Sequence, residues 1–312
     1  MRIVFMGTPD YAAKTLEKLI SSKHEVVAVF AQPDKPVGRK QVLTPPPVKV
    51  LAAEHSIPVY QPASLKTGEH TQILEQIAPD AIVVVAYGKI LPEDILSIPK
   101  YGCINGHASL LPKYRGASPI QWSIVCGETE TGVTTMLMDK GMDTGDILEQ
   151  TTVKIGEDET AGELFERLSE ISADLMLSTL QKLENGTITP KKQDESKATY
   201  APIIKKEMAL LVFTKSSAEI FNAVRGFYPW PCAYFFIEGR RIKAIKCRLG
   251  DKTSSPAGAV VGNTDYLEVA CGDGRTVIFE ILQPEGSRQM SAKQMLCGRP
   301  VAAGYIIGGQ NG

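Results

Sequence analysis

The sequence predicts an α/β fold in which a doubly wound sheet, mainly parallel, is followed by a smaller β-rich domain. Three observations support this prediction. First, short β-branched apolar runs alternate with amphipathic segments of helical period in the first half of the chain. Second, the run Ala81–Ala86 is apolar on both faces. Third, short β-rich runs separated by glycine-containing turns begin after residue 207. At roughly 150 residues per domain, 312 residues suggest about two domains.

The first predicted domain covers residues 1–183. Its expected strands are Ile3–Met6, Glu25–Ala31, Pro58–Tyr60, Ala81–Ala86, Gly102–His107 and Val133–Met138. Its expected helices are Ala12–Ser21, Val48–His55, Thr71–Ile77, Ile120–Cys126 and Ala161–Leu183. A strand with two apolar faces lies at the centre of a parallel sheet. Ligands of such sheets bind at the carboxyl ends of the strands.

Residues 184–206 are polar and contain Asn185-Gly186 and Pro190, which indicates a linker over the surface. The second predicted domain covers residues 207–312 and begins with a helix at Ser217–Arg225. Its short strands suggest a small OB-like barrel: Ala233–Ile237, Arg241–Cys247, Ala259–Val261, Tyr266–Ala270 and Thr276–Leu282. This part carries 12 Lys and Arg against 9 Asp and Glu, whereas the first 206 residues carry 22 against 26.

Composition argues against several classes of protein. A net charge of −1 provides no general basic field for nucleic acid, so any such binding must use a local patch. The strongest apolar run, Ala81–Tyr87, is far shorter than the roughly 20 residues of a membrane span. The six cysteines form no CxxC pair, and no signal peptide is apparent. We therefore expect a monomeric cytoplasmic protein with free thiols and no membrane association.

Asn105-Gly106-His107 lies at the end of a predicted strand. Side chains at positions i and i+2 of a strand point to the same face, so Asn105 and His107 are expected to project together. An amide that donates to an oxyanion and an imidazole that moves a proton suit acyl-type transfer. The alternative is a polar strand end that caps a turn.

A Gly-rich acidic segment, Asp139–Asp146, follows the next strand. Its spacing does not match an EF-hand, and we expect no metal here. A strand–helix–strand crossover would place both strands in one sheet and bring Asp143 near His107, where a carboxylate orients an imidazole. The alternative is an ordinary loop aspartate.

Three further segments are candidate binding loops. Ser109–Gly116 contains Pro112, Gly116 and two cations, which fits either a rigid binding wall or an ordinary solvated turn. Gly7-Thr8-Pro9-Asp10 lacks the GxGxxG pattern and so argues against NAD or FAD. Gln32–Pro47 is a long proline-rich loop whose cations, Lys35, Arg39 and Lys40, could meet phosphates or simply be solvated.

Taken together, these motifs resemble those of the methionyl-tRNA formyltransferases over nearly the whole chain. The matching segments are GTPD at Gly7, QPDKPVGR at Gln32, AYGKILP at Ala86, INGHASLLPKYRGASPIQW at Ile104, GVTTMLMDKGMDTGD at Gly132, TYAPII at Thr199, NAVRGFYPWPCA at Asn222 and LQPEGSRQMS at Leu282. The Asn-x-His and SLLP-x-x-RG block is shared by enzymes that use 10-formyltetrahydrofolate. Gly106 departs from the valine that is usual in the family.

The resemblance implies a Rossmann-like catalytic domain and an OB-like domain that contacts tRNA. It implies formyl transfer from 10-formyltetrahydrofolate to the methionine of initiator Met-tRNA, without a metal. It implies catalysis by Asn105, His107 and Asp143, and tRNA contacts from Lys35, Arg39 and Lys40. The implied folate site comprises Tyr87, Gly88, Ile90, Leu91, Ser109, Leu110, Leu111 and Pro112.

Three other functions compete with this interpretation. Another 10-formyltetrahydrofolate enzyme, acting on glycinamide ribonucleotide or a sugar amine or as a hydrolase, would share the Asn105-x-His107 block. A nicotinamide-linked dehydrogenase would share the fold, but the sequence lacks its glycine pattern. A non-catalytic RNA-binding protein would bind tRNA without needing Asn105 or His107.

Overall fold

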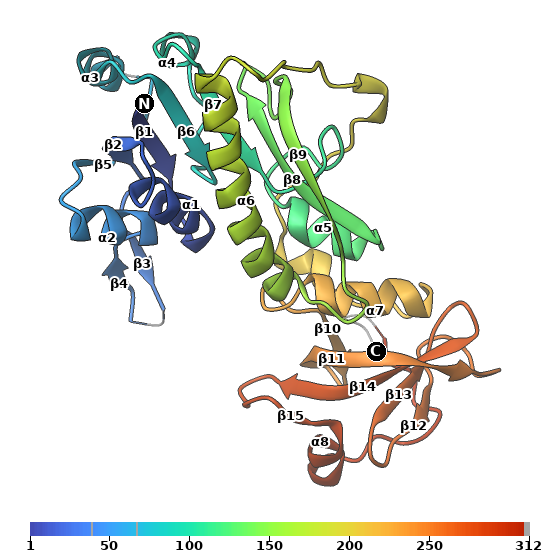
Figure 1. Cartoon of the computed structure of the whole chain (residues 1–312). Helices are drawn as coiled ribbons and strands as arrows, with labels where there is room; N and C mark the ends of the chain where they lie inside the picture. The colour runs from blue at the N-terminus through green and yellow to red at the C-terminus, as the bar shows by residue number, and fades with distance from the viewer. Residues whose placement is uncertain (39, 67, 309–312) are drawn as a thin grey trace. The chain divides into compact units, whose positions relative to one another are not determined.

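The computed structural model describes residues 1–38, 40–66 and 68–308, and it divides into two compact units that alternate along the chain. The first unit comprises Met1–Pro119, Thr131–Val153 and Phe165–Pro202. The second comprises Ile120–Glu130, Lys154–Leu164 and Ile203–Gly312. Figure 1 shows the elements of each unit in chain order. The boundaries expected from the sequence, 1–183 and 207–312 with a linker between them, stay a prediction.

The first unit is built on a seven-stranded sheet with the order β5-β2-β1-β6-β7-β8-β9 (Figure 1). The strands are β5 (Val59–Tyr60), β2 (Glu25–Phe30), β1 (Arg2–Gly7), β6 (Ala81–Val85), β7 (Cys103–His107), β8 (Glu130–Leu137) and β9 (Ile147–Lys154). Neighbouring strands from β5 to β7 are parallel. The prediction of a Rossmann-like, doubly wound sheet is confirmed.

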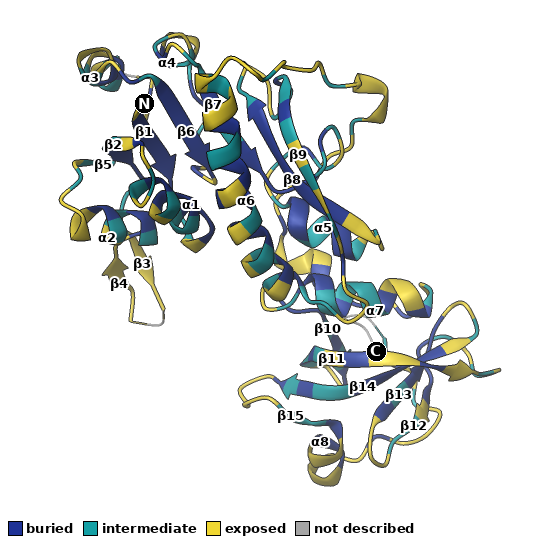
Figure 2. Ribbon diagram, in the orientation of Figure 1, coloured by how far each residue is buried: buried dark blue, intermediate teal, exposed yellow. Residues whose placement is uncertain are grey.

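Helices of the first unit cover this sheet. They are α1 (Asp10–Ile20), α2 (Pro47–Glu54), α3 (Glu69–Ile77), α4 (Glu93–Leu96) and most of α6 (Ala161–Glu184). Val4 and Met6 of β1 pack in one core cluster with Leu74 of α3 and Ile95 of α4. All five residues of β6 are buried, as Figure 2 shows, because both faces of the central strand are covered.

The direction of β8 corrects one expectation. The segment Gly102–Met138 was expected to form a strand–helix–strand crossover, which would make β7 and β8 parallel. The two strands are neighbours, but they pair antiparallel, with Ile104 opposite Leu137. Most of the intervening helix, α5 (Pro119–Val125), belongs to the second unit, and the antiparallel pairing means that this connection is not a crossover.

One predicted loop contains two strands, and another strand lies where the sequence predicted no element. Within Gln32–Pro47, β3 (Lys35–Val37) and β4 (Val42–Thr44) form an antiparallel hairpin. Its strand residues are all exposed, so the hairpin has no alternating apolar pattern that would reveal it. Strand β9 lies at the edge of the sheet, where its alternate positions are exposed.

The second unit contains a curled antiparallel sheet with the order β10-β11-β14-β13-β12, with β15 on β14. Its elements are α7 (Ser217–Gly226), β10 (Tyr234–Ile237), β11 (Arg240–Lys252), β12 (Val260–Gly262), β13 (Leu267–Ala270), β14 (Arg275–Pro284), β15 (Met290–Ser291) and α8 (Ala292–Gly298). Phe213, Phe235 and Phe279 pack together in the core. Register shifts along β11 are β-bulges that let the sheet curl. The predicted OB-like character is confirmed.

In the described parts of the chain, no helix combines the length and the apolar character that crossing a bilayer requires.

Candidate active site

Strand β7 places Asn105 and His107 on one face at the end of the parallel part of the sheet. Asn105 is opposite Val84 of β6, and His107 is opposite Thr134 of β8. His107 is buried, with 6% of its surface exposed, and Asn105 is half-buried. Gly106 points to the other face, where an added Cβ would come within 3.0 Å of Ser172 Oγ on α6. The strand therefore presents an amide and an imidazole together.

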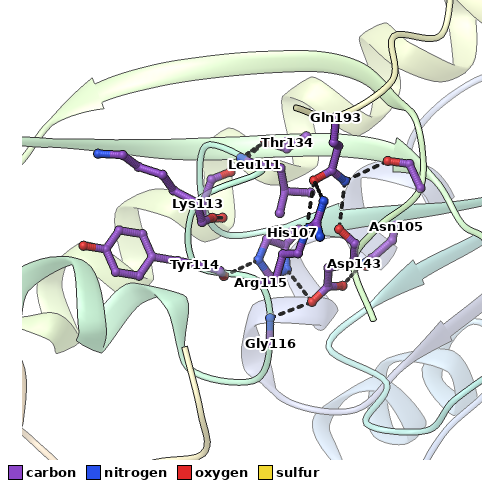
Figure 3. Close-up of polar contacts among 12 residues, drawn as sticks. Asn105, His107, Leu111, Lys113, Tyr114, Arg115, Gly116, Thr134, Asp143 and Gln193 are labelled. Carbon is purple, nitrogen blue, oxygen red and sulfur yellow. Dashed lines mark hydrogen bonds and ion pairs between the residues drawn. The ribbon is translucent and has the colours of Figure 1, made fainter. Parts of the chain in front are cut away.

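Asp143 lies beside both side chains (Figure 3). Its Oδ2 is 3.7 Å from His107 Nδ1, and its Oδ1 accepts a hydrogen bond from Asn105 Nδ2 at 3.4 Å. The backbone N–H of Gly116 also donates to Oδ2, at 2.8 Å. The structure thus brings together the three residues that the sequence singled out for catalysis.

The contacts of His107 assign its two ring nitrogens. Nε2 lies 2.9 Å from the backbone oxygen of Tyr114, and because a carbonyl can only accept, Nε2 carries a proton and donates it. In the neutral ring the lone pair is then on Nδ1, the nitrogen that faces Asp143. A proton accepted at Nδ1 would lie next to a carboxylate, which stabilises the charged ring.

The turn that carries Asp143 is tightly closed. Asp143 has a φ of 55°, which is uncommon for a residue with a side chain. At Gly145 an added Cβ would lie 1.8 Å from the backbone oxygen of Leu137, so only glycine fits. Asp139 closes the start of the turn by accepting from the Gly141 N–H and the Thr144 hydroxyl. The position of the Asp143 carboxylate therefore depends on an unusual backbone path.

The predicted binding loop Ser109–Gly116 is fixed by internal hydrogen bonds. Ser109 Oγ donates to the oxygen of Lys113 at 2.6 Å, and Thr134 of β8 bonds to both Ser109 and Leu111. Ser109 and Leu111 are buried, whereas Leu110 and Pro112 are half-buried. Leu110 and Pro112 are thus the members of this predicted folate segment that have surface to offer a ligand.

The other predicted folate segment follows β6. Tyr87 and Leu91 are buried, whereas Gly88 and Ile90 are exposed, Ile90 by 84%. The Tyr87 hydroxyl is buried without a hydrogen-bond partner among the described residues, and burial raises the pKa of Tyr87 to about 12. An unpaired buried hydroxyl beside an exposed apolar side chain is compatible with a ligand that has both polar and apolar parts.

Two of the predicted tRNA residues, Lys35 and Lys40, lie on the β3–β4 hairpin. Lys35 and Lys40 are exposed, and Arg39 lies outside the described residues. At the base of the hairpin, Asp34 accepts from Lys49 at 2.9 Å and from Gln61 at 2.7 Å, and these hydrogen bonds lower its pKa. Among the described residues, the hairpin makes no recorded hydrogen bond or ion pair with Asn105, His107 or Asp143.

The sequence interpretation missed three residues next to this cluster. Gln193 donates to backbone oxygens of the Asp143 turn, and Arg115 donates to Gln193 (Figure 3). Glu195 pairs with Arg115. Arg115 was part of a predicted loop, but Gln193 and Glu195 were assigned to a surface linker. A buried arginine needs an acceptor, but the burial of Arg115 is visible only in the structure, so the sequence carried no signal for these partners.

Among the described residues, no group of three or more His, Cys, Asp and Glu side chains is placed so that it could hold a metal ion.

Comparison with known proteins identifies the family. Residues 1–180 match the formyl transferase family, and residues 203–300 match the formyl transferase C-terminal domain. The methionyl-tRNA formyltransferase of Geotalea daltonii is 48% identical over 99% of this chain and 98% of its own length. The enzyme of that name from Geobacter sulfurreducens is 47% identical over 99% and 97%, respectively.

Solved structures share the fold. A sugar 3N-formyl transferase, WlaRD, crystallised with dTDP and 5-N-formyl-THF, has a TM-score of 0.68 at 22% identity and covers 92% of this chain and 99% of its own. A methionyl-tRNA formyltransferase from Clostridium thermocellum has a TM-score of 0.55 at 20% identity, over 80% and 93% of the two chains. The family, however, follows from the sequence relatives and the two matched domains: the chain belongs to the methionyl-tRNA formyltransferases.

Proposed function

We propose that this protein transfers the formyl group of 10-formyltetrahydrofolate to the α-amino group of methionine on initiator Met-tRNA, giving formyl-Met-tRNA for translation initiation. The family of the chain supports the reaction. The observation that carries the proposal is the cluster at the end of β7, where one carboxylate contacts both an amide and an imidazole. These groups are the ones that formyl transfer to an amine requires.

His107 is proposed to move the proton. An amine loses a proton as its nitrogen bonds to the formyl carbon, and a neutral imidazole is the side chain that most often accepts such a proton. Nδ1 is the available atom, since Nε2 donates to Tyr114. Asp143 Oδ2, 3.7 Å away, would stabilise the charged ring until His107 passes the proton to the departing nitrogen.

Asn105 is proposed to stabilise the developing negative charge. Its Nδ2 can donate to the formyl oxygen, and in other enzymes one such donor is worth about 3–4 kcal/mol in the transition state. The 3.4 Å contact with Asp143 orients the amide, because its Nδ2 faces the carboxylate. The amide and the imidazole thus approach a bound formyl group from the same strand.

The formyl donor is proposed to lie against the segments after β6 and β7. Ile90, Leu110 and Pro112 offer apolar surface to a flat ring, and the unpaired Tyr87 hydroxyl is a polar group within the first of these segments. The donor supplies the activated formyl group, and no metal is needed for the proton transfers assigned to His107. These exposed surfaces and the unpaired hydroxyl support the proposed folate residues, which are Tyr87, Gly88, Ile90, Leu91, Ser109, Leu110, Leu111 and Pro112.

The acceptor end of tRNA is proposed to meet Lys35, Arg39 and Lys40. Lys35 and Lys40 are exposed on the hairpin, and cations contact phosphates without regard to base sequence. We also propose that the enzyme works as a cytoplasmic monomer, which sedimentation of the purified protein would test.

The decisive assay combines purified protein, 10-formyltetrahydrofolate and initiator Met-tRNA and measures formyl-methionine after deacylation. Parallel reactions offer free methionine or an amino sugar nucleotide as the amine. Formylation confined to Met-tRNA supports the proposal. A preference for a small amine would instead indicate a different formyltransferase, and tRNA binding without formyl transfer would indicate an RNA-binding protein.

A further inference from the structure

Gln193 contacts the turn that holds the catalytic acid, although it lies 50 residues further along the chain. Its Nε2 donates to the backbone oxygens of Asp143 and Gly145, each at 2.8 Å. The two acceptors flank Thr144, so a single amide group ties together both sides of the turn. Gln193 is half-buried, between exposed neighbours in the predicted linker.

Arg115 fixes the orientation of that amide. Its Nε and Nη2 donate to Gln193 Oε1 at 3.1 and 2.8 Å, and only the oxygen of the amide can accept them. The nitrogen of the amide must then face the two carbonyls. Arg115 is 1% exposed, and Glu195 accepts from its Nη1 and Nη2 at 2.9 and 2.7 Å.

Residues just after Gln193 and Glu195 hold the loop that follows β7. Thr199 and Ala201 exchange backbone hydrogen bonds with the segment Pro112–Arg115. Gly116, whose N–H donates to Asp143 Oδ2, has a φ of 113°, and an added Cβ there would lie 2.8 Å from the oxygen of Ala201. Residues 193–201 therefore support both the turn that carries Asp143 and the loop whose Gly116 N–H donates to the Asp143 carboxylate.

The turn needs such support. Asp143 has a left-handed backbone, a conformation that persists only when the surroundings over-determine it. Two hydrogen bonds from a fixed amide are such a constraint. Without them the turn can relax, and the carboxylate would move away from Asn105 Nδ2 and His107 Nδ1, with which it is now in contact.

We propose that Gln193 is a positioning residue for the catalytic acid: its side-chain amide, oriented by Arg115, holds the turn that sets Asp143 against His107. The inference rests on the proposed function of His107 and Asp143. It gives the linker segment a role in catalysis that is separate from joining two domains.

Two substitutions separate this role from simple packing. Gln193→Ala removes both donors and should lower kcat by about 10- to 100-fold while KM for Met-tRNA and for the formyl donor changes little, because misplacement of a catalytic group costs this much. Gln193→Glu keeps the shape and the acceptor for Arg115, but it turns an oxygen toward two carbonyl oxygens. It should therefore be at least as slow as Gln193→Ala. If the side chain only filled space or anchored Arg115, Gln193→Glu would be as active as wild type, and the proposal would fail.

A double-mutant cycle with Asp143→Ala tests whether Gln193 acts through the acid. Once the carboxylate is absent, Gln193→Ala should cause little further loss of kcat. Multiplicative losses would overturn the inference. Gln181→Ala, an exposed glutamine of α6, is the control matched by residue type and should behave as wild type.

Other outcomes are also informative. Should Gln193→Ala fail to fold in a thermal melt, the isosteric Gln193→Glu carries the test, and normal turnover by that variant rejects the proposal. A wild type that does not formylate Met-tRNA would overturn the proposed function, and this inference with it. An active wild type with unaffected Gln193 variants would overturn the inference alone.

Discussion

The two segments that support the catalytic cluster and the β3–β4 hairpin differ sharply in how they are held. The turn Asp139–Asp146 and the loop Ser109–Gly116 are tied by side-chain hydrogen bonds to β8 and to residues 193–201. In the β3–β4 hairpin every strand residue is exposed (Figure 2). The side chains of Gln41 and Thr44 donate to carbonyls of the hairpin itself. All three segments were predicted from sequence as candidate functional loops.

The difference matches the two tasks proposed for them. Proton transfer requires donor and acceptor atoms within hydrogen-bond reach, so a loop that carries catalytic groups must be fixed from several sides. The attraction of cations to phosphates is electrostatic and independent of base sequence, so exposed cations on a hairpin suffice for it. The comparison predicts that changes in the fixed loops lower kcat and stability, whereas changes in the hairpin alter KM and salt dependence.

The largest effect is expected at the cluster itself. His107→Ala and Asn105→Ala should each lower kcat by about 100-fold or more, because one removes the proton acceptor and the other a donor to the formyl oxygen. Steady-state kinetics with Met-tRNA measure the loss, and circular dichroism checks that each variant folds. Turnover close to wild type in either variant would remove the mechanism.

Replacing a glycine by alanine should lower the free energy of unfolding more in the turn of Asp143 than in the hairpin. Gly145→Ala places a Cβ 1.8 Å from the backbone oxygen of Leu137, an overlap that only backbone movement can relieve, and we expect a loss of about 3 kcal/mol. In the hairpin, Gly38 has a φ of 72° with nothing within 4 Å of an added Cβ. Gly38→Ala should therefore cost only the conformational penalty, about 1 kcal/mol.

Urea unfolding of both variants measures this difference in free energy. Equal losses would mean that the turn of Asp143 is no more tightly held than the hairpin, and the comparison between the two segments would fail.

The same contrast explains what the sequence could predict. Asn105 and His107 were found because strand periodicity places i and i+2 on one face, a local rule. The approach of Asp143 was expected from a crossover that does not exist, since β8 pairs antiparallel with β7. The predicted proximity was nevertheless right, because the turn after β8 folds back against Leu137 and brings the Asp143 carboxylate to Asn105 and His107.

Gln193 could not be predicted in this way. Its partners are backbone oxygens and a guanidinium distant in sequence, and a hydrogen bond of this kind leaves no periodic pattern. Polar residues in a proline- and lysine-containing segment indicate a solvated linker. The hairpin was missed for a related reason, since exposed strands with Pro36 lack the apolar alternation that marks a strand.

A smaller effect is expected from the hairpin cations. Lys35→Ala and Lys40→Ala should each raise KM for Met-tRNA a few-fold and reduce the slope of log KM against log salt by about 1, while kcat stays near wild type. Removing Arg39 should act in the same direction. Kinetics over a range of salt concentrations measure the slopes. A fall in kcat at constant KM would place these residues in the catalytic step, contrary to the comparison.

The smallest effect is expected at Glu195, the exposed residue that pairs with Arg115. Hydrogen bonds from Arg115 hold the pKa of Glu195 below its usual value of 4.5. A carboxyl whose pKa is lower in the folded than in the unfolded protein stabilises the fold above its unfolded pKa, and this contribution is lost as pH falls through the folded pKa. Glu195→Gln should therefore lower the free energy of unfolding slightly near neutral pH, and the difference from wild type should vanish in acid.

Urea unfolding at about pH 7, 5 and 3 measures this difference. Most of the Glu195 side chain is in water, with 68% of its surface exposed, so solvent screening keeps the effect small. Glu54→Gln, at the exposed end of α2, removes a similar carboxylate without touching Arg115 and should follow the wild-type curve. If the stability difference between Glu195→Gln and wild type persisted unchanged in acid, it could not come from the charge of Glu195. Arg115 would then be held by Gln193 and by its own burial.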